Sequence, residues 1–306
     1  MNFIEIKDVV KRYSGHTALD GVTINVPKGC IYGLLGPNGA GKTSLIRIIN
    51  RITRQDSGEV LLDGRPIVDD DVTRIGYLPE ERGLYKKMKV LDQIVYLARL
   101  KGMPKSIAVA EARSWLKRFD LEQWADKKLE ALSKGMQQKV QFIATVIHRP
   151  QLLIFDEPFS GFDPVNAEQL KQEILALRDG GATILFSTHN MESVEAVCEQ
   201  ITLINQSRVV LQGSVDEIRH AYKKNIIAVS LEGGQALPAN DDLYAILPAK
   251  SDNKRETLIK LNSGVGVRSA VSWLNDNCNL TGFHEVLPSM HEIFIETVNL
   301  TKQQPQ

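Results

Sequence analysis

The chain has 306 residues, and its 37 Lys and Arg residues balance 37 Asp and Glu residues, so its formal net charge at pH 7 is zero. This balance excludes a strong overall attraction to nucleic acid or anionic lipid, although it does not exclude a local basic patch. No run approaches the roughly 20 apolar residues that cross a bilayer, and the first residues lack the apolar core of a signal peptide. The three cysteines form no CxxC pair, which favours reduced thiols and a cytosolic setting.

The first part of the chain is predicted to alternate strands with a helix. Residues 3–10 and 18–26 show the alternation and β-branched content of strands, and residues 30–35 form a short apolar strand. After a glycine-rich loop, apolar residues recur at the spacing of an amphipathic helix. These residues are Leu45, Ile48, Ile49 and Ile52.

A helical region is expected next, followed by further strands. Residues 90–131 are predicted to be mostly helical with a break at 102–104, and another helix is expected between Ser133 and Pro150. Residues 152–156 and 182–187 are continuous apolar runs, typical of central parallel strands, with a helix beginning near Pro164 between them. A hairpin is expected from 201–205 and 208–212. This alternation predicts an α/β core.

From about residue 222 the sequence changes character. Strand-like and helix-like segments alternate up to residue 300 and predict a small, separate α+β domain, and residues 301–306 are expected to be a disordered tail. The predicted domains are therefore 1–220, with a helical subdomain inserted at about 85–149, and 222–300. The second domain contains no recognisable catalytic constellation.

The glycine-rich loop fits G-x-x-x-x-G-K-[ST] at every fixed position and lies between a predicted strand and a predicted helix. Its glycines let backbone N–H groups point at phosphate oxygens, and the helix adds its positive N-terminal end. We expect Lys42 to reach the β- and γ-phosphates and assist catalysis, and the Thr43 hydroxyl to hold Mg²⁺. The expected ATP-binding residues of the loop are Gly36, Pro37, Asn38, Gly39, Ala40, Gly41, Lys42, Thr43 and Ser44.

Two acidic residues complete the predicted nucleotide site. The apolar strand at 152–156 ends in Asp156, at the edge where α/β sheets bind ligands, and Asp156 is expected to hold Mg²⁺. Glu157 follows directly and is predicted to be the general base that polarises the attacking water. Together with the loop, these residues indicate a P-loop NTPase that uses ATP and Mg²⁺.

The segment from Leu132 to Lys139 resembles the LSGGQ signature of the ABC ATPase family. Ser133, Gly135 and Gln137 match it, whereas Lys134 and Met136 depart from it. The signature is followed by the Asp-Glu strand, by Ser160-Gly-Phe-Asp163 and by Ser187-Thr-His189, and this order is similar to the family over about residues 1–215. The resemblance implies an ABC-type fold with N-terminal antiparallel strands, a mixed sheet and a helical subdomain.

The resemblance also implies roles for further residues. Residues Ser133, Lys134, Gly135, Met136 and Gln137 would contact, in trans, ATP bound to a second ATPase subunit, expected to be an identical copy. Asp163 would lie in the D-loop at that dimer interface, and His189 would contact the γ-phosphate and orient the water with Glu157. Tyr13 would stack on adenine, since a phenol ring offers its π face.

One departure concerns the loop in which the family carries a glutamine. The matching position is Glu80, with Glu81 as the alternative register, and a glutamate there would still ligate Mg²⁺ while adding negative charge beside the nucleotide. The segment YLPEERGLY is similar to the corresponding segment of bacterial sodium and drug exporter ATPase subunits. The closing segment, PSMHEIFIETV, resembles the end of their accessory domain. For that domain we expect a dimer-stabilising or regulatory role.

These observations favour the ATP-hydrolysing subunit of an ABC exporter, located in the cytoplasm on the inner face of the membrane. It would drive an integral membrane permease on a separate chain and would contact that permease near residues 80–100. Residues 82–85 would either form part of a groove in which the permease docks or be a plain exposed loop. The alternative is a soluble ABC ATPase acting on nucleic acid or ribosomes. A single cassette with room only for a small helical subdomain disfavours that class, so no nucleic-acid partner is expected.

Overall fold

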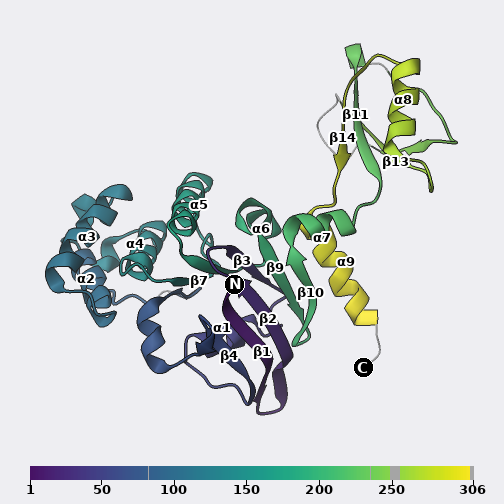
Figure 1. Ribbon diagram of the computed structural model, residues 1–306. Helices are drawn as coiled ribbons and strands as arrows, with labels where there is room; N and C mark the ends of the chain where they lie inside the picture. Colours follow the sequence, from purple (N-terminus) through teal and green to yellow (C-terminus); the bar gives the residue numbers. More distant parts are fainter. Residues whose placement is uncertain (82, 235, 249–255, 304–306) are drawn as a thin grey trace. The chain divides into compact units, whose positions relative to one another are not determined.

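The computed structural model describes residues 1–81, 83–234, 236–248 and 256–303 (Figure 1). The chain forms two compact units. The first contains Met1–Val215 and the segment from Thr297 onward, and the second contains Asp216–Glu296. This division falls a few residues before the expected boundary at 220–222, and the last segment of the chain belongs to the first unit.

Two sheets form the frame of the first unit. The smaller sheet is antiparallel, with the strand order β2-β1-β4-β5, and the larger has the order β10-β9-β3-β8-β7-β6. In the larger sheet all neighbours are parallel except β10, which pairs antiparallel with β9. The strands are β1 (Asn2–Tyr13), β2 (His16–Pro27), β3 (Ile31–Leu35), β4 (Ser57–Leu62), β5 (Arg65–Pro66), β6 (Ile75–Leu78), β7 (Leu152–Asp156), β8 (Thr183–Ser187), β9 (Gln200–Asn205) and β10 (Arg208–Ser214). The predicted mixed α/β core is confirmed.

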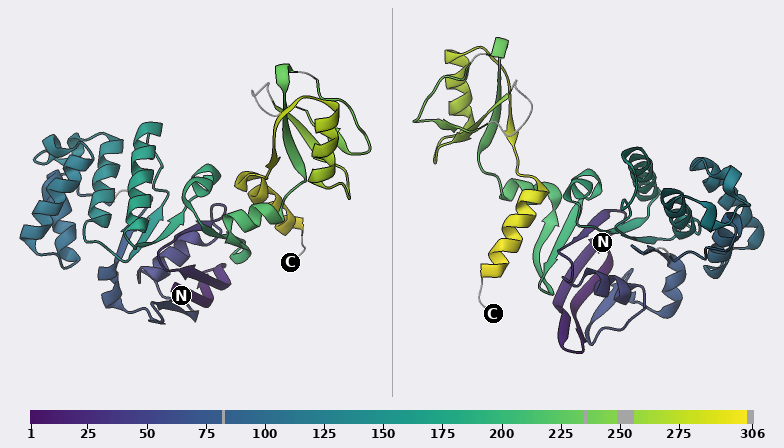
Figure 2. Two further views of the ribbon diagram at one scale, coloured as in Figure 1. Left: turned by 45° about the horizontal axis from the view of Figure 1, so that its top comes forward. Right: turned by 180° about the vertical axis from the view of Figure 1, so that it is seen from behind.

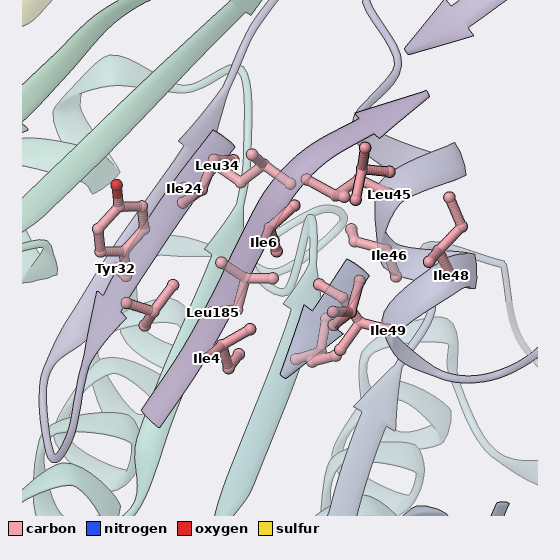
Figure 3. Packing of buried hydrophobic residues seen from close by; sticks show 14 of the residues in the cluster. Ile4, Ile6, Ile24, Tyr32, Leu34, Leu45, Ile46, Ile48, Ile49 and Leu185 are labelled. Atoms are coloured by element: carbon pink, nitrogen blue, oxygen red, sulfur yellow. The ribbon is translucent and has the colours of Figure 1, made fainter. Parts of the chain in front are cut away.

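Helix α1 (Lys42–Ile49) packs between these sheets in a single apolar core. Its buried face carries Leu45, Ile46, Ile48 and Ile49, which meet residues of β1, β2, β3 and β8 (Figure 3). Each fully buried aliphatic side chain stabilises the fold by about 1.5–3 kcal/mol, so the core holds the start of α1 firmly against both sheets. The glycine-rich loop, which ends at this helix, is therefore attached to a rigid part of the fold.

The helical subdomain of the first unit consists of α2 (Val90–Leu100), α3 (Lys105–Arg118) and α4 (Lys134–Val146), and Figure 2 shows these helices grouped together from two further sides. They confirm the predicted helical region and its break. Trp115, Phe119 and Phe142 pack edge-on or stacked within it, and Phe142 also contacts Phe155 of β7. These aromatic contacts join α4 to the strand that carries Asp156. Further helices are α5 (Pro164–Asp179), α6 (Met191–Val197) and α7 (Val215–Ala221).

The second unit is built on a four-stranded antiparallel sheet with a helix packed against it, as the α+β expectation requires, and it also contains most of α7. The strand order is β12-β13-β11-β14, and Ile227, Tyr244 and Ile259 pack against Ala270 and Leu274 of the helix. The elements are β11 (Ile226–Leu231), β12 (Tyr244–Ile246), β13 (Glu256–Leu261), α8 (Val267–Asn277) and β14 (Leu280–Val286). In the described residues, no helix is both long and apolar enough to cross a membrane.

The structure corrects two expectations. Helix α1 ends at Ile49, because Asn50 caps it by donating from its side chain to the Ile46 carbonyl, and Ile52 is therefore 62% exposed. The expected disordered tail begins too early, because α9 (Met290–Gln303) continues to Gln303; residues 304–306 lie outside the described residues. Thr301 anchors this end of the helix, since its hydroxyl accepts a hydrogen bond from the Asn205 side chain at 2.6 Å.

Candidate nucleotide site

The glycine-rich loop takes a conformation that only glycine allows at two positions. Gly36 has φ +151° and Gly41 has φ +114°. A Cβ atom at Gly36 would lie 2.3 Å from the Ile204 carbonyl oxygen, and one at Gly41 would lie 2.2 Å from the Ala18 carbonyl oxygen. The loop therefore lies directly against β9 and β2, which fixes its backbone before α1 begins.

Lys42 is the first residue of α1 and is almost fully buried, with 9% of its surface exposed. Its Nζ donates to the carbonyl oxygens of Gly36 at 2.6 Å and Pro37 at 3.1 Å. Burial lowers the pKa of Lys42, and the nearby carboxylates of Glu157, Asp156 and Glu80 oppose this shift. The cation thus lies inside the curve of the loop, within reach of any phosphate bound there.

Asp156 ends β7 and faces the same region. Its carboxyl group is buried, with 7% exposure, and burial is the main cause that raises its pKa. The pairing of β7 with β8 sets Asp156 beside Ser187, whose hydroxyl is buried. The pKa of Tyr77, on β6, is raised to about 12 by burial and by the charge of Asp156. In its ionised form, a carboxylate this well buried needs a cation as its partner.

Glu157 follows Asp156 with φ +51°, and the loop after β8 surrounds its carboxylate. The backbone N–H of His189 donates to Oε1 at 2.8 Å, and Nδ1 of the His189 ring lies 2.5 Å from the same oxygen. The Thr188 hydroxyl donates to Oε2 at 2.9 Å. The Glu157 side chain is 13% exposed and that of His189 is 70% exposed, so the histidine ring lies on the outer side of the pair.

These residues line one pocket of about 470 Å³. Most of the predicted site residues meet there: Tyr13, Asn38, Gly39, Ala40, Gly41, Lys42, Thr43, Ser44, Glu80, Asp156, Glu157 and His189. Of the two register alternatives, it is Glu80 that lines the pocket. The sequence analysis missed His16 and Ala18, which also line it. Their position at the start of β2, just after the turn that follows Tyr13, is the signal that could have found them.

The predicted signature residues lie outside this pocket, at the N-terminus of α4. Ser133 caps the helix, since its Oγ accepts the Met136 N–H at 3.3 Å, and Ser133 and Lys134 are exposed. The side chain of Gln137 donates to the carbonyls of Leu129 and Leu132 at 3.1 and 2.9 Å.

Asp163 also lies outside the pocket and caps helix α5. It accepts hydrogen bonds from the backbone N–H groups of Val165 and Asn166 at 3.1 and 3.0 Å. Two hydrogen bonds of this kind hold the segment after Glu157 in place at the start of α5. This cap position is compatible with the predicted D-loop, because Asp163 is exposed.

The donor set of the pocket fits Mg²⁺. Thr43, Glu80 and Asp156 offer a hydroxyl and two carboxylates, which are the hard oxygen donors that Mg²⁺ prefers. Within the described ranges no three His, Cys, Asp or Glu side chains form a ready metal cluster. Mg²⁺ in nucleotide sites is usually bound by one or two carboxylates together with water and substrate phosphates.

A second pocket of about 360 Å³ lies in the same unit, between α2, α4 and β6. Ile52 and Leu100 line it, and both are 62% exposed. Gly83 and Leu84 of the stretch predicted to form a docking groove line it too, whereas Arg82 lies outside the described residues. We call this pocket the subdomain groove.

Comparisons with known proteins identify the family of the chain. Residues 19–160 match the family model described as ABC transporter, and residues 213–298 match that of the DrrA1-3-like ATP-binding protein C-terminal domain. An uncharacterized ABC transporter ATP-binding protein, YhaQ of Bacillus subtilis (strain 168), is 43% identical over 96% of this chain and 98% of its own length.

More distant relatives point the same way. The daunorubicin resistance ATP-binding protein DrrA3 of Streptomyces coeruleorubidus is 30% identical over 83% of this chain and 82% of its own. A solved ATP-binding subunit of an ABC transporter covers 72% of this chain and 93% of its own, with a TM-score of 0.67 and 29% identity. The chain therefore belongs to the ABC transporter family, as an ATP-binding subunit that hydrolyses ATP to power transport.

Proposed function

We propose that this protein drives an exporter, whose membrane permease is a separate chain, from the cytoplasmic face of the membrane. The match of residues 213–298 to the C-terminal domain of DrrA-like proteins carries the proposal. Relatives with that name are daunorubicin resistance proteins, and another is a linearmycin resistance ATP-binding protein. The shared accessory domain favours an exporter over the alternative class of soluble ATPases.

The pocket supports hydrolysis by positioning and charge. Lys42 would exchange its bonds to the loop carbonyls for phosphate oxygens, and the N–H groups of the loop would hold the other phosphate oxygens. Glu157 would take the proton of the attacking water as general base, with His189 orienting the γ-phosphate and the water. Mg²⁺, held by Thr43, Asp156 and Glu80, would neutralise charge on the phosphates.

The pocket is only half of the proposed catalytic site. The α4 N-terminus is exposed, and free N–H groups together with the positive helix end attract a phosphate. Since the signature lies outside its own pocket, we propose that it contacts ATP bound to a second copy of the chain. ATP would then close two copies on each other, and hydrolysis would reopen them.

The subdomain groove supports contact with a permease. Exposed apolar side chains such as Ile52 and Leu100 at the rim of a groove mark interaction surfaces. The groove also touches β6, the strand that leads to Glu80. A permease segment bound there would therefore sense the state of the nucleotide pocket through that strand.

The test is purification of the tagged protein from its native cells in mild detergent, with identification of the co-purifying proteins. A stoichiometric integral membrane protein supports the proposal, whereas a soluble protein or nucleic-acid particle without one contradicts it. Leu100→Glu should remove the membrane protein from the preparation. Ile107→Glu is the matched control, because Ile107 is 51% exposed on α3 and does not line the groove.

A further inference from the structure

The loop between β8 and α6 holds both oxygens of the Glu157 carboxylate, and two different residues share this task. Oε1 of Glu157 is contacted by His189, through the backbone N–H and the ring Nδ1 of that residue. Oε2 accepts the hydroxyl of Thr188 at 2.9 Å. Thr188 is 2% exposed and does not line the nucleotide pocket. Its hydroxyl therefore acts on Glu157 and not on the nucleotide.

The direction of the Thr188 hydrogen bond is fixed by a neighbour. The backbone N–H of Asn190 donates to Thr188 Oγ at 3.0 Å, so the hydroxyl oxygen already serves as an acceptor there. Its single proton is directed to Glu157 Oε2. Asn190 in turn caps α6, since its Oδ1 accepts the Ser193 N–H at 3.0 Å. Thr188 is thus held by its hydrogen bond to Asn190 at the start of α6, independently of the histidine ring.

We propose that Thr188 is a positioning residue that keeps Glu157 aimed at the hydrolytic water. This inference rests on the proposed role of Glu157 as the general base. When the exposed His189 ring turns to the γ-phosphate, Oε1 keeps only a backbone donor, and Thr188 still fixes Oε2. A hydrogen bond to a charged group is among the stronger ones in proteins, so its loss lets the carboxylate rotate away from its productive angle.

The test compares three variants of the full chain by steady-state ATP hydrolysis. Thr188→Val keeps the side-chain shape and removes the hydroxyl, and we expect kcat to fall on the order of 10- to 100-fold. The KM for ATP should change by less than about two-fold, because the hydroxyl does not touch the nucleotide. Thr188→Ser restores the hydroxyl and should keep kcat near that of the native chain. Thr188→Ala also lacks the hydroxyl and replaces the valine variant if that one melts early.

Several outcomes would overturn the inference. A kcat of Thr188→Val equal to that of the native chain would show that the hydroxyl is dispensable, and an equal loss in Thr188→Ser would indicate packing as the cause. Glu157→Gln, measured in parallel, separates this failure from that of the proposed function. If Glu157→Gln loses turnover and Thr188→Val does not, only the inference fails; if Glu157→Gln keeps turnover, the role of Glu157 itself is wrong.

Discussion

Replacing Gly41 by alanine tests whether the shape of the loop makes the nucleotide site. The new Cβ would lie 2.2 Å from the Ala18 carbonyl oxygen and 2.8 Å from Leu19 Cδ2. The loop would have to shift by at least about 0.8 Å to reach the 3.0 Å below which real Cβ contacts are essentially never seen. The shift relieves the strain in the free protein. To bind ATP, the loop would have to return to its native conformation and take up that strain again.

The expected penalty follows from two contributions. A residue forced into a rare backbone conformation costs about 1–3 kcal/mol, and a lost hydrogen bond to a charged group costs about 1.5–3 kcal/mol. Together they predict a loss of at least about 2.5 kcal/mol, which weakens the Kd for ATP by roughly 60-fold.

Titration calorimetry with ATP measures this Kd, and Gly29→Ala is the matched control. Gly29 also has a positive φ, +71°, but a Cβ there meets nothing within 4 Å and it lies outside the pocket. Gly29→Ala should therefore lose some stability and keep the native Kd. If Gly41→Ala binds ATP as tightly as Gly29→Ala does, the loop geometry described above does not determine binding.

Two further predictions concern stability and base stacking. Asp71 is 1% exposed and bonded to Arg65 and Arg74, and the Arg65 hydrogen bonds are the main cause that lowers its pKa to about 2. The stabilisation by the ionised carboxylate is complete above the ordinary pKa of about 3.9 and disappears as the pH falls towards 2. In urea unfolding, Asp71→Asn should therefore have a free energy of unfolding about 2 kcal/mol below that of the native chain at pH 7, and the difference should narrow below pH 4. The exposed Asp70→Asn is the control. Tyr13 is 43% exposed and lines the pocket. Tyr13→Ala should weaken the Kd for ATP by about 2- to 13-fold, whereas Tyr13→Phe should keep the native Kd. A Kd unchanged in Tyr13→Ala would rule out adenine stacking.

The sequence predicted the elements whose signal is local. The glycine-rich loop and the apolar strand ending in Asp156 and Glu157 have a pattern that depends on neighbouring residues only, and the structure places both as expected. Strand β4 was missed, because its first three residues are exposed and only Val60, Leu61 and Leu62 are buried, which gives too short an apolar run. Strand β14 was missed for a similar reason, since most of its residues are exposed at the edge of the sheet.

Contacts between distant segments could not be predicted. Thr188 meets Glu157 across 31 positions of the chain, and neither residue type signals the other. Thr301 meets Asn205 across 96 positions, which extends α9 beyond the point where its composition suggests an end. Gln137 matched a signature position in the sequence, but its amide is used by carbonyls of the preceding turn.

The central claim is that the pocket hydrolyses ATP with Glu157 as base and needs a second copy of the chain. The most direct measurement is the rate of ATP hydrolysis with Mg²⁺ over a range of protein concentrations, for the native chain and for Glu157→Gln. We predict that the native rate rises faster than linearly with concentration, and that Glu157→Gln still binds ATP but turns it over at least about 100-fold more slowly. Equal rates for the two proteins, or a strictly linear rise well below any dimer dissociation constant, would contradict the account.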